Sequence, residues 1–79
     1  MAELKETINE MLSDDYIDRF KAEHKQLVIR INNLNDYIKY YKKNISTLEL
    51  DLLSKQLTAM IEYRNILELR AAIDKIDLS

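Results

Sequence analysis

The sequence contains no glycine, no proline, no cysteine and no tryptophan. Glycine and proline are the residues that most strongly interrupt helices, so nothing in the composition forces a helix to end. Without cysteine the chain forms neither a disulfide nor a thiolate metal site. The absence of glycine also excludes a glycine-rich phosphate loop, the motif on which many nucleotide-binding enzymes depend.

Long apolar runs and an excess of one charge are missing too. The longest apolar run has three residues, whereas a membrane span needs roughly 20. Acids interrupt the apolar residues of the N-terminus, so we expect no secretory signal, no membrane association and a cytoplasmic protein. The 12 basic and 14 acidic side chains give a net charge of -2. Duplex nucleic acid requires a strongly basic surface, and we expect no binding to it.

One regular pattern is present in the first half of the chain. Residues that are apolar, with one histidine among them, follow one another at alternating spacings of three and four: Ile17, Phe20, His24, Leu27, Ile31, Leu34, Ile38, Tyr41 and Ile45. This is the a/d seam of a heptad repeat, and it places one stripe along a single long helix. The pattern predicts an all-α protein with coiled-coil-like packing.

We divide the chain, as a single domain over residues 1–79, into three helical segments. A short N-terminal helix is expected over 1–13, and two long helices are expected over 14–43 and 47–76. A one-sided helix of about three turns is marginal alone, so the first segment must dock on another element. The two long segments are nearly equal in length, which suits a helical hairpin.

Capping signals locate the turn of this hairpin at residues 44–46. Asn44 is suited to the left-handed residue that follows many helices. Ser46-Thr47-Leu48-Glu49 has the pattern of a capping box, in which the Ser46 hydroxyl accepts from the Glu49 amide. Folding back here gives antiparallel pairs that are apolar or nearly so: Tyr41 with Leu50, Ile38 with Leu53, Leu34 with Leu57, Ile31 with Met60, and His24 with Leu67.

The third segment carries a second apolar stripe, well away from the hairpin seam on a helical wheel. Its members are Leu48, Leu52, Ala59, Tyr63, Ile66 and Ile73. A two-helix hairpin cannot cover both stripes, so the N-terminal helix or another subunit must cover the second one. We therefore expect a homo-oligomer.

The sequence gives little support to catalysis. His24 is the single histidine and lies in the seam, where we interpret it as a polar residue of the core. No second histidine at metal-ligand spacing accompanies it. Asp14, Asp15 and Asp18 lie at a helix start, where acids stabilise the positive end of the helix dipole. We predict a non-enzymatic protein with no catalytic residue, no metal site and no cofactor.

The most suggestive polar stretch is residues 37–43, with three tyrosines and three lysines. Aromatic faces stack on bases and lysines contact phosphates, so we take Tyr37, Lys39, Tyr40 and Lys43 as candidate ligand-binding residues. The alternative is a solvated helix end whose tyrosines cover the edge of the core. A second aromatic-basic group consists of Tyr16, Arg19 and Phe20, for which packing is the simpler interpretation.

Arg64 and Arg70 are the alternative candidates for ligand binding. Helical spacing places Arg64 on the hairpin face, where a charge needs a partner, and either Glu23, Glu68 or an anionic ligand suits it. Arg70 follows Tyr63 on one side of the same helix, so a guanidinium and an aromatic ring share that side.

Two stretches resemble a known group of proteins. One is Tyr-Ile-Asp-Arg-Phe-Lys-Ala-Glu-His-Lys-Gln-Leu at 16–27, and the other is Leu-Leu-Ser-Lys-Gln-Leu-Thr-Ala-Met at 52–60. Together they resemble small helical-hairpin proteins of crAss-like and other tailed phages. The second half is also similar to the hairpin of phage anti-CBASS and anti-Thoeris sponges, which sequester cyclic nucleotide signals. The residues that correspond are Gln56, Met60, Leu67, Arg70, Ala71 and Ile73.

The resemblance implies a phage protein that acts in the cytoplasm of an infected bacterium. We expect it to bind and sequester a nucleotide second messenger, either a cyclic oligonucleotide or an ADP-ribose derivative, in pockets between subunits. The alternative is a helical adaptor that binds a host or phage protein through the second apolar stripe.

Overall fold

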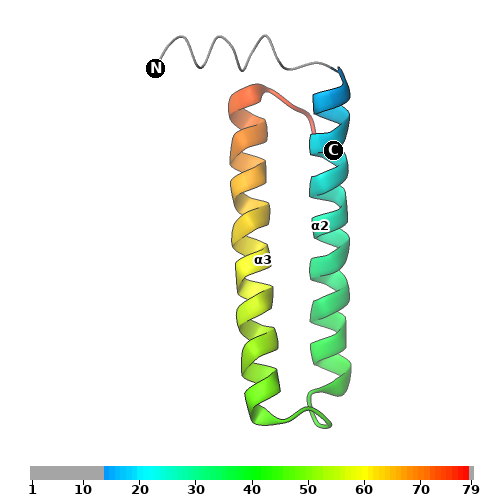
Figure 1. The fold of residues 1–79 in the computed structure, drawn as a ribbon, viewed down its shortest axis with the longest axis vertical. Helices are drawn as coiled ribbons and strands as arrows, with labels where there is room; N and C mark the ends of the chain where they lie inside the picture. Colours follow the sequence, from blue (N-terminus) through cyan, green and yellow to red (C-terminus); the bar gives the residue numbers. More distant parts are fainter. Residues whose placement is uncertain (1–13, 79) are drawn as a thin grey trace.

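The structure, a computed structural model, describes residues 14–78. These residues form two α-helices of equal length, α2 (Asp14–Tyr41) and α3 (Thr47–Asp74), each of 28 residues. The helices run antiparallel as a hairpin (Figure 1), and at 1.5 Å per residue each is about 42 Å long. The predicted all-α hairpin is therefore confirmed for this part of the chain. The expected N-terminal helix lies outside the described residues.

The turn between the helices follows the predicted signals in part. Ser46 is the N-cap of α3, and its hydroxyl accepts from the Glu49 amide at 3.2 Å. However, α2 ends at Tyr41, two residues before the predicted boundary, because the Asn44 amide donates to the Tyr41 carbonyl and tightens the last turn. The left-handed conformation expected at Asn44 is wrong, since the one positive φ among residues 14–78 is at Lys75.

The end of α3 is also two residues earlier than predicted, because the chain reverses at Lys75. Lys75 adopts a left-handed conformation, with φ 57° and ψ 40°. Its amide donates to Ala72, and the Ile76 amide donates to Ala71 at 2.8 Å. This pattern is a Schellman motif, which usually has glycine at the left-handed position. The motif turns Ile76 inward, where its side chain is buried.

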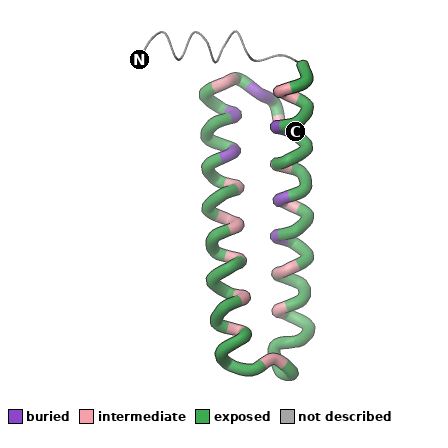
Figure 2. Tube along the Cα trace, viewed as in Figure 1, coloured by how far each residue is buried: buried purple, intermediate pink, exposed green. Residues whose placement is uncertain are grey.

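The hydrophobic core is concentrated toward the end of the hairpin that carries both Asp14 and Asp74, here called the open end (Figure 2). The buried residues are Phe20, Leu27, Ile31, Leu67, Ala71 and Ile76. The segment after α3 crosses toward α2 at this end (Figure 1) and adds Ile76 to the core. Toward the opposite end, here called the turn end, the seam residues Leu34, Ile38 and Ile45 are only half-buried and Tyr41 is exposed.

The second apolar stripe on α3 is exposed, as its helical spacing predicts. Leu48 is 71% exposed, Ile66 53% and Ile73 72%, and Leu52, Ala59 and Tyr63 are exposed as well. Leu69, at 67%, extends this surface. Among the described residues, neither helix is long and apolar enough to cross a membrane. The expected homo-oligomer stays a prediction.

Candidate functional site

The six residues predicted to bind a ligand fall at three separate places along the hairpin. Tyr37, Lys39, Tyr40 and Lys43 lie at the turn end, Arg64 lies near the middle of the pair, and Arg70 lies near the open end. One hairpin therefore does not bring the lysines of the turn end together with the two arginines.

At the turn end, the tyrosines are exposed, and the rings of Tyr37 and Tyr41 are in tilted contact. The rings of Tyr37 and Tyr41 lie 4.9 Å apart with an interplanar angle of 37°. Tyr40 is 78% exposed, and Lys39 and Lys43 are also exposed. This arrangement offers aromatic faces and cations to solvent. It is equally compatible with the solvated helix end considered above.

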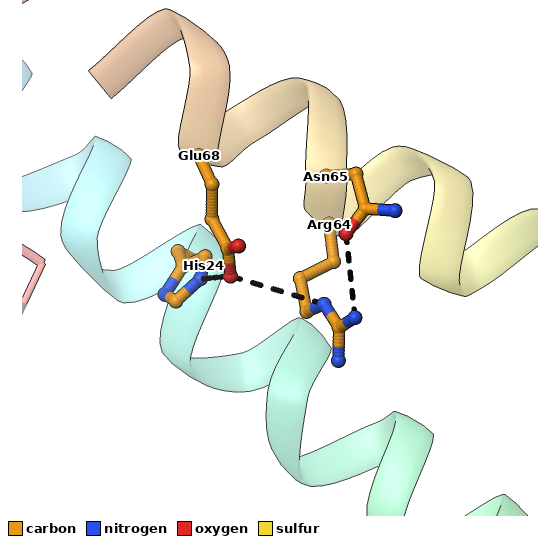
Figure 3. A network of polar contacts seen from close by, with 4 residues as sticks. All are labelled: His24, Arg64, Asn65 and Glu68. Carbon is orange, nitrogen blue, oxygen red and sulfur yellow. Dashed lines mark hydrogen bonds and ion pairs between the residues drawn. The ribbon is translucent and has the colours of Figure 1, made fainter. Parts of the chain in front are cut away.

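Arg64 takes part in a polar network that bridges the two helices (Figure 3). The Glu68 carboxylate lies 2.9 Å from His24 Nε2 and 3.8 Å from Arg64 Nε, and Arg64 Nη2 donates to Asn65. Arg64 Nε is buried and has no hydrogen bond, so the Glu68 charge is its nearest compensation. Of the alternatives for Arg64, pairing with Glu68 is the one that the structure contains.

At the open end, Arg70 is held against two aromatic side chains of α2. Its guanidinium carbon lies 5.1 Å from the centre of the Phe20 ring, and its Nη2 donates to the Tyr16 hydroxyl at 3.2 Å. The Tyr16 and Phe20 rings lie 6.2 Å apart. Phe20 is buried in the core and therefore fixes the position of the guanidinium above it.

These contacts form the wall of a groove of about 350 Å³, here called the open-end groove. It is lined by Tyr16, Arg19, Phe20, Glu23 and Arg70. Arg19 is exposed, and its Nη2 lies 3.4 Å from Asp15 Oδ2. An exposed ion pair of this kind contributes little stability, so Arg19 can exchange Asp15 for a ligand with little loss of free energy. Two guanidiniums beside the half-buried Tyr16 ring suit an anionic ligand that carries a flat ring, because guanidiniums pair with phosphate oxygens and rings stack, whereas Phe20 is buried beneath Arg70.

A second groove, of about 420 Å³, lies on the other side of the seam. Its lining consists of Lys21, His24, Lys25, Val28 and Leu78. It offers two ammonium groups but no aromatic face apart from the imidazole, and that imidazole is already bonded to Glu68. It is therefore the weaker candidate for a ligand that contains a base.

The sequence suggests Arg70 as a candidate but does not predict its contacts with Tyr16 and Phe20. Tyr16, Arg19 and Phe20 stood out as an aromatic-basic group and were interpreted as packing. The signal that connects them to Arg70 is the hairpin register, which pairs Phe20 with Ala71, one residue from Arg70. Glu23 was one of the expected partners of Arg64, and the structure places it in the open-end groove, while Arg64 pairs with Glu68.

Comparison with known proteins places the chain in a family. The Sequestin family model matches residues 14–73, which cover both helices of the hairpin. The chain therefore belongs to the Sequestin family. No curated protein and no solved structure matches it.

Proposed function

We propose that this chain is a non-enzymatic phage protein that sequesters a nucleotide-derived signal of bacterial immunity. The ligand is a cyclic oligonucleotide or an ADP-ribose derivative, held in the cytoplasm of the infected host. Its phosphates contact Arg70 and Arg19, and its base or sugar packs on the Tyr16 ring of the open-end groove. The name of the family, Sequestin, agrees with binding by sequestration.

The observation that carries this proposal is the placement of Arg70 over Phe20. A guanidinium that is already ordered by a buried ring and a tyrosine hydroxyl loses little conformational freedom when it binds an anion. One nitrogen of Arg70 donates to Tyr16, whereas a guanidinium has five N–H donors. The remaining donors suit a phosphate.

The composition of the groove favours binding without cleavage. Among residues 14–78, its lining contains one carboxylate, Glu23, and no serine, threonine, histidine or second carboxylate. General acid–base catalysis and covalent catalysis each need a positioned base or nucleophile with a supporting partner. We therefore propose that the protein acts stoichiometrically.

A thermal-shift panel of cyclic dinucleotides, cyclic trinucleotides and ADP-ribose derivatives tests the proposal. A ligand that binds only the folded chain raises the melting temperature by mass action. We expect at least one compound to do so, and Arg70→Ala to abolish the shift. Arg30→Ala is the matched control, because Arg30 is an exposed arginine of the same hairpin outside the groove lining. An equal shift in both variants would remove the groove from consideration.

The exposed apolar face of α3 favours a second candidate function. Leu48, Leu52, Ile66, Leu69 and Ile73 are each more than half exposed. A helix with such a face can dock in the groove of a host or phage protein. If no compound of the panel binds, this adaptor function becomes the leading proposal, and retention of a host protein by the wild type but not by Ile66→Glu tests it.

A further inference from the structure

We propose that two copies of this chain pair antiparallel through the exposed face of α3. The pairing joins the open-end groove of each copy to the turn end of the other, so that two equivalent composite sites form. The pairing is inferred from the exposed residues of α3 alone. The ligand assigned to the composite sites rests on the proposed function.

The exposed face of α3 has the spacing of a second heptad seam. Leu52, Ala59, Ile66 and Ile73 follow one another at intervals of seven residues, and all four are exposed. Leu48 and Leu69 occupy the complementary positions of the same repeat and are also exposed. Such a seam packs against a second helix of the same kind and covers the apolar surface at both ends of α3.

The two charged residues in the middle of the seam favour a second copy that runs in the opposite direction. The apolar ends of the seam pair with each other, because Leu48 then meets Ile73 of the second copy and Leu52 meets Leu69. Lys55 and Glu62 occupy the middle, and antiparallel pairing brings these opposite charges within one helical turn across the interface. Parallel pairing would instead place Lys55 on Lys55 and Glu62 on Glu62, and like charges in contact are unfavourable.

The charges at the two ends of the hairpin favour the same direction. Residues 37–48 at the turn end contain three lysines and no acid. The open end carries Asp14, Asp15 and Asp18 in the first turns of α2 and Asp74 at the end of α3, together with Arg19 and Lys75. Antiparallel pairing sets the lysines at the turn end of each copy near these aspartates of the other copy.

This arrangement accounts for the separation of the candidate ligand residues within one hairpin. In the antiparallel register, Leu48 of the second copy is level with Ile73, so the second copy's turn is level with Tyr16, at the mouth of the open-end groove. Arg19 and Arg70 from one copy and the turn-end lysines from the other then surround one ligand. A single copy supplies the two arginines at its open end and the three lysines at its turn end, so neither end alone has all of these cations.

The absence of cysteine from the chain allows a direct test of direction. We would refold tagged Leu52→Cys together with untagged Leu69→Cys under oxidising conditions and measure the masses of the covalent products. We expect the mixed disulfide to dominate, because antiparallel pairing brings these two positions within bridging distance. A product of Leu52→Cys with itself would show parallel pairing and overturn the proposal. Light scattering of the wild type should give twice 9.4 kDa, and a monomer would also overturn it.

A complementation experiment tests the composite site. The ligand is the panel compound that gives the largest thermal shift with the wild type. Arg70→Ala and the double variant Lys42→Ala/Lys43→Ala should each bind it at least tenfold more weakly. When the two variants are refolded together, about half of the dimers are mixed, and each mixed dimer has one intact site out of two. About a quarter of the wild-type binding sites should therefore return. If the wild type binds and mixing restores nothing, the composite site is wrong while sequestration stands. If a disulfide-linked dimer binds no compound, the proposed function fails, and the ligand part of this inference fails with it.

Discussion

The guanidinium of Arg70 lies over the ring of Phe20, with 5.1 Å between the guanidinium carbon and the ring centre. The two residues come from different helices, and Phe20 belongs to the buried core. Arg70 is therefore both a contact between α2 and α3 and a cation presented at the groove. Its replacement should affect stability as well as binding.

We expect Arg70→Ala to lower the free energy of unfolding by about 0.5–1 kcal/mol, the range of an exposed cation–π contact. The measurement is urea unfolding followed by circular dichroism. Arg30→Ala should stay within about 0.5 kcal/mol of the wild type, as surface substitutions usually do. Equal losses in the two variants would mean that the contact with Phe20 contributes nothing.

Ser46→Ala should lower the free energy of unfolding by about 1 kcal/mol, because the Glu49 amide loses its acceptor at the start of α3. Ser54→Ala is the control, since Ser54 lies inside α3 and its carbonyl, not its hydroxyl, accepts from Thr58. Alanine is the better helix former there, so this variant should be unchanged or slightly more stable. Chemical denaturation of both variants checks the cap.

Lys75→Gly should raise the free energy of unfolding by about 0.5–1 kcal/mol, because glycine adopts the left-handed conformation without a Cβ clash. The gain is limited by the larger entropy that glycine gives to the unfolded chain. Lys75→Ala retains the Cβ and should resemble the wild type. A destabilised glycine variant would contradict the Schellman geometry at this end of α3.

Glu68→Ala should cost about 1–2 kcal/mol, because it removes the carboxylate beside His24 and leaves Arg64 Nε buried without a counter-charge. His24→Leu should cost less, since leucine continues the apolar seam and Glu68 keeps Arg64. Thermal unfolding of the two single variants and the double variant measures the coupling. Additive effects in that cycle would show that His24 and Glu68 act independently.

Much of the hairpin follows from local rules in the sequence. The heptad seam places Phe20, Leu27 and Ile31 on one side of α2, and all three are buried. The cap at Ser46 follows from a hydroxyl three residues before Glu49. These features depend on periodicity and on short-range hydrogen bonds, which a single sequence displays directly.

The remaining features depend on contacts that local rules do not contain. The reversal at Lys75 lacks the usual glycine, so nothing in the sequence signals it, and the burial of Ile76 is tied to that reversal. The open-end groove requires the register between the helices at the level of single residues. Arg70 faces the groove, whereas its neighbour Ala71 is buried. An error of one residue in the predicted register would therefore exchange a groove residue for a core residue.

Isothermal titration followed by release of the ligand tests the central claim most directly. The protein is titrated with the panel compound that gives the largest thermal shift. The complex is then heated until the protein unfolds, and the mass of the released compound is measured by mass spectrometry. We expect saturable binding that weakens as salt rises, because phosphate contacts are electrostatic, with loss of binding in Arg70→Ala and quantitative recovery of the intact compound. A cleaved product, or binding that Arg70→Ala leaves unchanged, would contradict sequestration in the open-end groove.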